Sequence, residues 1–325
     1  MSPEEALRTA PGEHHRSAAA NFLARRLGVS GPWPWITTIT CTTMVVLFVG
    51  LRLTPNPSSE TALNQWGYRS GFEIWSGGPR HLYSLLTSNF LHEAPWHVAL
   101  NLAVIWMLGR ALEPIVGIVR MAWLILGAAL VSSAIQLAIF GNTGIGGSGI
   151  AFGLFGFGLV ARRRFPDLKR VFSERFIVAG LTWFGAAWVI LTHQIANGGH
   201  LGGLVFGLCA GGALLSKKRQ LTKNVAQAAF LVLAVGFGMF CPWSAAWWSA
   251  IGFRAHSLGH YEWAVDAYEM SLEVKPDQTW VLGNLARAQW AVGKRVAASG
   301  TLLKMRALDL DMARKLEAEL ANQSR

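Results

Sequence analysis

The chain has 325 residues, of which 52% are hydrophobic and only 14% are charged, and its formal net charge is +11. Soluble domains carry about 25% charged residues, so the composition argues against a soluble globular protein. A positive charge can indicate nucleic-acid binding. Here, however, the Lys and Arg residues stand in short clusters between apolar blocks, which is typical of membrane proteins, and we expect no nucleic-acid partner.

In chain order, a polar segment (residues 1–34) comes first, and we expect it to be cytoplasmic. Seven apolar blocks follow, each near the length that crosses a hydrocarbon core of about 30 Å. Their approximate ranges are 35–54, 95–112, 118–140, 147–161, 176–193, 199–216 and 224–243. The aromatic-rich loop 55–91 is too apolar for a free linker, so it should lie in the membrane interface or fold against the helices. The sequence predicts an all-α, polytopic membrane helix bundle over residues 35–243.

Basic residues mark alternate connections between the blocks. They follow the second, fourth and sixth blocks, as in Arg162-Arg163-Arg164 and Lys217-Lys218-Arg219, whereas 141–147 and 194–199 contain none. The positive-inside rule then places the N-terminus in the cytoplasm and everything after the seventh span on the opposite side. We expect a multi-pass integral protein in contact with the lipid bilayer, in a bacterial inner membrane.

The remaining segment, 245–325, has an internal period of 34 residues. Equivalent positions are Gly252 and Ala286, Gly259 and Gly293, Ala264 and Ala298, and Tyr268 and Leu302. This spacing resembles two tetratricopeptide repeats, each a helix–turn–helix, and the alternative is a plain amphipathic helical tail. Such repeats could bind a protein partner on the non-cytoplasmic side.

Three polar clusters interrupt the apolar blocks: His97 with Asn101, then Ser148, then His200. Polar residues inside membrane spans are costly and mark function by default. Each cluster lies at the start of a span that enters from the non-cytoplasmic side, so all three should share one leaflet.

Small residues predict that the fourth and sixth spans approach closely, because glycine faces let membrane helices pack together. The glycines are spaced by four, as Gly149 and Gly153 on one span and Gly203, Gly207 and Gly211 on the other. Contact would bring His200 to Ser148, and a serine within reach of a histidine base is an activated nucleophile. Gly147 and Gly149 would also leave the hydroxyl open to substrate.

Donors for a developing oxyanion are available nearby. His97 and Asn101 share one helix face, and the backbone N–H of Ser148 is free at its helix start. Phe152, one turn after Ser148, could brace the imidazole ring of His200. No carboxylate is close in sequence, so we expect a dyad and not a triad. The other histidines, His92 included, have no assigned role, and we expect no metal ion and no cofactor.

Over residues 35–216 these stretches resemble the rhomboid family of intramembrane serine proteases. The resemblance is carried by Leu85-Leu86-Thr87, Phe90-Leu91-His92, His97-x-x-x-Asn101, Gly109, Glu113, Gly146-x-Ser148-Gly149 and His200-x-x-Gly203-x-x-x-Gly207. It implies a six-helix core, here with a seventh span. It also implies Ser148 as nucleophile, His200 as base, an oxyanion hole that includes His97 and Asn101, and Phe152 as support for the base.

The leading interpretation is a serine endopeptidase that cleaves transmembrane-helix substrates through an acyl-enzyme. Because helical backbone bonds are satisfied internally, such substrates must unwind before they are cut. The alternative is a non-catalytic membrane adaptor whose repeat tail recruits partners. A solute transporter would want charged residues within the spans or inverted repeats, and the sequence has neither.

Overall fold

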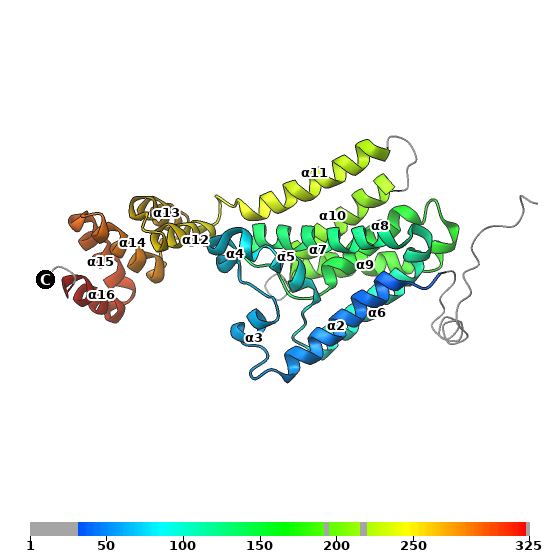
Figure 1. The fold of residues 1–325 in the computed structure, drawn as a ribbon, viewed down its shortest axis with the longest axis horizontal. Helices are drawn as coiled ribbons and strands as arrows, with labels where there is room; N and C mark the ends of the chain where they lie inside the picture. The colour runs from blue at the N-terminus through cyan, green and yellow to red at the C-terminus, as the bar shows by residue number, and fades with distance from the viewer. Residues whose placement is uncertain (1–31, 192–194, 215–219, 323–325) are drawn as a thin grey trace, which may run out of the picture.

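The computed structural model describes residues 32–191, 195–214 and 220–322. Within these ranges the fold is all-α, with no strand, as expected. A bundle of long helices is followed by a smaller body of short helices at one end (Figure 1). Most of the polar segment 1–34, and the cluster Lys217-Lys218-Arg219, lie outside the described residues.

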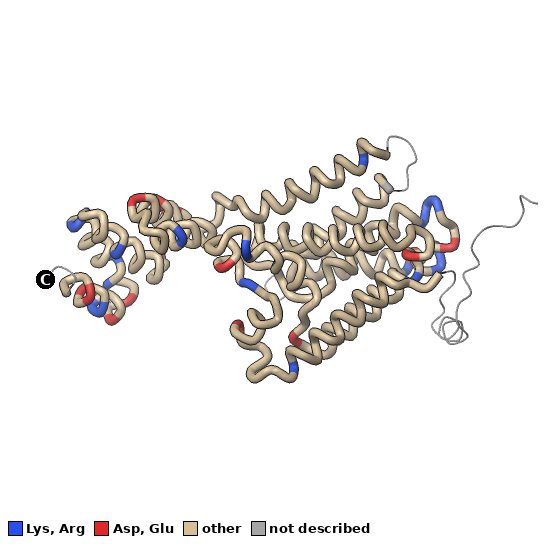
Figure 2. Tube along the Cα trace, in the orientation of Figure 1, with Lys and Arg blue, Asp and Glu red and all other residues tan. Residues whose placement is uncertain are grey.

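Four described helices are long and apolar enough to cross a membrane: α2 (Trp35–Leu53), α6 (Pro95–Val116), α7 (Ile118–Phe140) and α11 (Gln220–Met239). Three shorter helices complete the bundle: α8 (Ser148–Ala161), α9 (Glu174–Ile190) and α10 (Asn197–Leu214). Each of the seven corresponds to one expected apolar block. Lys and Arg gather at the end of this bundle that faces away from the short C-terminal helices (Figure 2).

A buried carboxylate ties α2 to α6. Glu113 accepts hydrogen bonds from the backbone N–H groups of Ile36 and Thr37, both at 2.8 Å, and from Oγ1 of Thr37 at 2.7 Å. The first N–H groups of a helix have no partner within that helix, so Glu113 satisfies two that would otherwise stay unpaired away from water. The contact fixes the start of α2 against the C-terminal end of α6.

Helix α8 packs against α10, α7 and α6, and its glycines meet those of α10. A Cβ atom added to Gly203 would collide with the backbone carbonyl of Gly149, and one added to Gly207 would collide with that of Gly153. Only glycine permits this separation of the two backbones. The close approach of the fourth and sixth spans is therefore present over these four residues.

The loop between α2 and α6 is folded into short helices: α3 (Glu60–Gln65), α4 (Gly71–Gly77), η1 (Gly78–His81), α5 (Ser84–Thr87) and η2 (Ser88–Phe90). A capping box starts α4, in which Ser70 and Glu73 exchange side-chain and backbone hydrogen bonds. Trp75 then anchors α4 to α11, because its Nε1 donates to the carbonyl of Gly238 at 2.9 Å. The loop thus folds against the helices, one of the two expected arrangements.

The C-terminal body contains α12 (Ala245–Ser257), α13 (Tyr261–Val274), α14 (Thr279–Ala291), α15 (Arg295–Leu308) and α16 (Leu310–Asn322). Its turns repeat every 34 residues. Gly259 and Gly293 have φ of +79° and +78°, a region that favours glycine. Next to them, His260 donates its backbone N–H to Ala255 and Lys294 donates its own to Gln289, both at 2.9 Å. The period read from the sequence therefore corresponds to a repeated helix-ending geometry.

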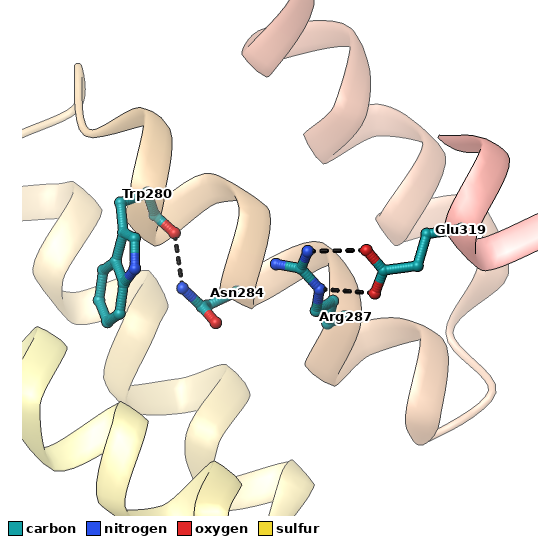
Figure 3. A network of polar contacts seen from close by, with 4 residues as sticks. All are labelled: Trp280, Asn284, Arg287 and Glu319. Carbon is teal, nitrogen blue, oxygen red and sulfur yellow. Dashed lines mark hydrogen bonds and ion pairs between the residues drawn. The ribbon is translucent and has the colours of Figure 1, made fainter. Parts of the chain in front are cut away.

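An ion pair closes the last part of this body. Nε and Nη2 of Arg287 on α14 donate to the two carboxylate oxygens of Glu319 on α16, at 3.0 and 2.9 Å (Figure 3). One turn earlier on α14, Nδ2 of Asn284 donates to the carbonyl of Trp280 at 2.8 Å. The paired carboxylate and guanidinium hold α16 against α14.

Aromatic contacts join the C-terminal body to the loop helix α4, which lies beside α12 (Figure 1). The ring centroid of Phe72 lies 5.4 Å from those of both Phe253 on α12 and Trp280 on α14. Trp247 packs with Trp75 in one buried cluster. The tail is thus packed against the membrane domain and is not a detached module.

Candidate active site

Ser148 and His200 are in direct contact. Ser148 is the first residue of α8, and His200 lies in the first turn of α10. Nε2 of His200 is 2.8 Å from Oγ of Ser148, a hydrogen-bonding distance. The glycine contacts between α8 and α10 bring the two helix starts together, so a pair separated by 52 positions in the chain becomes adjacent.

The imidazole of His200 is buried and held in place by ring packing. Its centroid lies 4.6 Å from that of Phe152, with 31° between the planes. The turn that carries it is fixed by two buried side chains. Oε1 of Gln136 accepts from the backbone N–H of Gly199, and Nδ2 of Asn197 donates to the carbonyl of Ala187. Nδ1 of His200 has no partner among the described residues, so the geometry is that of a pair and not of a triad.

His92, which the sequence left without a role, lies at the centre of the next polar cluster. Its Nε2 is 3.0 Å from Nδ2 of Asn101 and 3.2 Å from the backbone N of Gly147. Both of these groups are donors, so Nε2 is the accepting nitrogen and Nδ1 carries the proton, which points to the carbonyl of Phe90. One ring thereby orients the Asn101 amide and the residue before Ser148. Periodicity and spacing do not identify it, since it precedes α6 in an irregular segment. The signal available was the stretch Phe90-Leu91-His92, which is part of the family resemblance.

His97 packs beside His92. Its ring centroid is 5.0 Å from that of His92, and its ring lies against Gly146. Gly146 has φ of +115° and would place a Cβ 2.5 Å from Cε1 of His97, so glycine is required there twice over. The backbone N–H of Gly146 donates to the carbonyl of Ser88 at 3.1 Å. The loop before Ser148 is therefore held by the segment that contains His92.

Gly147 and Gly149 serve close packing, which differs from the expectation that they leave the serine hydroxyl uncovered. A Cβ on Gly147 would lie 2.5 Å from the terminal methyl group of Met44 on α2. One on Gly149 would collide with the hydroxyl of Ser132 on α7. The two glycines let the start of α8 lie directly against its neighbours, and access to Ser148 comes from the cavity on its other side.

That cavity has a volume of about 860 Å³ and opens beside α6 and α9. Polar side chains line one part of it: His97, Asn101, Gln136, Asn142, Ser148 and His200. Aromatic side chains line another: Phe140, Phe152, Phe155, Phe176 and Trp183. Among the described residues, no group of three or more His, Cys, Asp or Glu side chains is placed to hold a metal ion.

The family model and the relatives found by comparison with known proteins indicate the same family. A family model described as Rhomboid domain matches residues 79–218, which include both helix starts and, except for Tyr68, the residues that line the cavity. Relatives named "Rhomboid protease GlpG" from Salmonella paratyphi A, Salmonella choleraesuis and Salmonella typhi are each 28% identical over 190 residues. The match covers 58% of this chain and 64% of each relative, so the chain spans slightly less than two thirds of the length of these relatives. Together these similarities support the rhomboid family for the membrane domain.

Proposed function

We propose that this protein is an intramembrane serine endopeptidase in which Ser148 is the nucleophile and His200 the general base. The observation that carries the proposal is the 2.8 Å contact between Nε2 of His200 and Oγ of Ser148 inside a cavity. A base at this distance can take the hydroxyl proton as Oγ attacks a peptide carbonyl. Similarity to rhomboid proteases adds independent support.

The remaining steps use the groups around the pair. Attack places negative charge on the carbonyl oxygen, and the Asn101 amide, His97 and the backbone N–H of Ser148 are the candidate donors to it. The Asn101 amide has two N–H groups, and His92 engages only one of them. His200 then gives its proton to the departing amine as the peptide C–N bond breaks, which leaves an acyl-enzyme. Neutral His200 next takes a proton from a water molecule as that water attacks the acyl carbon, and it returns the proton to Oγ of Ser148 as the ester bond breaks.

The substrates are transmembrane helices that enter between α6 and α9 from the bilayer. The cut falls on the non-cytoplasmic side, because α8 and α10 begin away from the end of the bundle where Lys and Arg gather (Figures 1 and 2). We further propose that the tail is a pair of tetratricopeptide-like repeats on that same side. Its 34-residue spacing of helix starts and turns supports this assignment.

The test is labelling of the full-length protein in detergent with a fluorophosphonate, which phosphonylates activated serines with loss of fluoride. Wild-type protein should be labelled, whereas Ser148→Ala should not be and His200→Ala should be labelled at least about 10²-fold more slowly. Failure of the wild-type protein to react, or equal labelling of Ser148→Ala, would remove the protease proposal and favour the non-catalytic adaptor.

A further inference from the structure

The lining of the catalytic cavity contains one carboxylate, that of Glu93. None of the described residues that line the cavity is Lys or Arg, and the other ionisable side chains there are Tyr68, His97 and His200. Glu93 is exposed and lies two residues before α6 begins at Pro95. It therefore belongs to the open rim of the cavity and not to its apolar depth.

The Glu93 carboxylate is not used inside the described fold. No hydrogen bond or ion pair joins it to another described residue, and the ion pairs there involve other carboxylates. Arg69, next to the cavity residue Tyr68 in the chain, donates instead to the carbonyls of Asn64 and Tyr68. Its guanidinium lies 5.9 Å from the ring centroid of Tyr83. The Glu93 carboxylate is therefore available to interact with a group on a bound substrate.

Other carboxylates reinforce the negative charge on this side of the cavity. Burial raises the pKa of Tyr68, and the charges of Glu60, Glu73 and Glu93 raise it further. All three carboxylates therefore act on one residue of the cavity wall. A cleft that is apolar inside and carries one sign of charge at its rim focuses that charge on whatever enters.

We propose that Glu93 makes the enzyme prefer substrates with a Lys or Arg next to the scissile bond on its non-cytoplasmic side, and disfavour Asp or Glu there. The inference rests on the proposed protease function and names its substrate class. A solvent-exposed ion pair contributes little, so the expected discrimination is about two- to fivefold for each change of charge. Glu93 also lies near the N-terminus of α6, where a carboxylate stabilises the helix. That role is indifferent to substrate charge.

The experiment uses one transmembrane substrate in three versions, which carry Lys, Gln or Glu at the residue just outside the cut. The full-length enzyme is assayed in proteoliposomes, and kcat/KM is compared between versions. Wild type should cleave the Lys version fastest and the Glu version slowest. Glu93→Gln should flatten this order, and Glu93→Lys should reverse it. The matched control is Glu273→Lys, an exposed carboxylate on α13 outside the cavity lining, which should keep the wild-type order.

The outcomes separate this inference from the function on which it rests. Equal cleavage of the three versions by wild type, or an unchanged order in Glu93→Lys, would overturn the charge preference and leave the protease intact. If wild type cleaves none of them and Ser148 is not labelled by a fluorophosphonate, the protease proposal itself fails. Should Glu93→Lys not fold, the near-isosteric Glu93→Gln still decides, because a structural role would lower all three rates equally.

Discussion

At the scale of single residues, the imidazole of His92 has the most consequences for the chemistry. It accepts hydrogen bonds from the Asn101 amide and from the backbone N–H of Gly147, so it sets the direction of one oxyanion donor and of the loop before Ser148. We predict that His92→Phe lowers kcat by about tenfold. This loss is smaller than the 10²–10³-fold loss that is typical when an oxyanion donor itself is removed. Loss of the acceptor leaves two buried donors unpaired, which should also lower stability by about 1–3 kcal/mol.

A double-mutant cycle distinguishes positioning from a general structural effect. If His92 acts through Asn101, adding His92→Phe to Asn101→Ala should lower kcat little beyond Asn101→Ala alone. Multiplicative losses in the double variant would mean that His92 does not work through the amide. Measured melting temperatures of all four proteins separate the catalytic effect from unfolding.

Among the site residues, the sequence could predict those whose positions follow from the apolar helical blocks. Ser148 and His200 stand at starts of apolar blocks, and their glycine neighbours gave a reason for contact, so their adjacency could be expected. His92 could not, because its contacts come from an irregular segment folded back by Ser88 and Asn89 onto α7. Spacing rules carry no information about such segments.

At the scale of elements, the contact between α8 and α10 holds the catalytic pair together. We predict that Gly203→Ala destabilises the protein by about 1–3 kcal/mol and slows fluorophosphonate labelling of Ser148. Its Cβ would meet the backbone carbonyl of Gly149, which cannot move without shifting the helix. The control is Gly212→Ala on the same helix, where a Cβ would meet nothing within 4 Å. That change should be neutral or slightly stabilising, since Ala favours helix by about 1 kcal/mol over Gly.

The sequence also predicted the approximate bounds of the long helices. The block expected at 118–140 coincides with α7. The block expected at 95–112 begins with α6 but ends four residues before it, since the helix continues through Pro114 to Val116. The short helices of residues 60–90 were not expected as helices. They owe their form to capping and to contacts such as that of Trp75 with α11, and neither is encoded in hydrophobic period.

A titratable group within the tail predicts how these helices respond to acid. Burial lowers the pKa of His256, and the nearby charge of Arg287 lowers it further. Its Nδ1 is buried without a described partner, and its ring lies 5.2 Å from that of Tyr261. A depressed histidine pKa means that the folded tail binds fewer protons than the unfolded tail. The stability of the folded tail is therefore unaffected by His256 at a pH above the histidine pKa of the unfolded chain, about 6.5. It decreases as the pH falls from there toward the lower pKa of the folded state.

Thermal unfolding of the full-length protein in detergent, followed through the tail tryptophans at pH 7.5 and at about pH 5.5, should show the tail melting earlier in acid. His256→Gln should reduce this pH dependence, and His260→Gln, which changes an exposed histidine in the turn before α13, should leave it intact. An identical acid response in His256→Gln would assign the effect to groups other than His256. The Glu319 carboxylate is not one of them, because its hydrogen bonds with Arg287 lower its pKa and its contribution is lost only at lower pH.

At the scale of the whole molecule, the tail and the loop helix α4 form one contact region on the side where α8 and α10 begin. Phe72 contacts both Phe253 and Trp280, so α4 is held by two successive helix pairs of the tail. Aromatic pairs of this kind contribute about 0.5–1.5 kcal/mol each beyond area burial. We predict that Phe253→Ala loosens α4 and increases hydrogen exchange of residues 71–77 by several-fold. The matched control is Trp263→Ala, an aromatic residue of α13 that is 63% exposed and should leave this exchange unchanged.

The same measurement tests whether the tail reaches the catalytic loop. From α4 the chain continues through η1 and α5 to Ser88, whose carbonyl accepts from Gly146 two residues before Ser148. If the tail holds this path, exchange in residues 88–92 should rise together with that of α4 in Phe253→Ala, and fluorophosphonate labelling of Ser148 should slow. If α4 loosens while residues 88–92 keep their protection, the contacts of Asn89 with α7 are sufficient by themselves, and the tail acts on the loop helix but not on the chemistry.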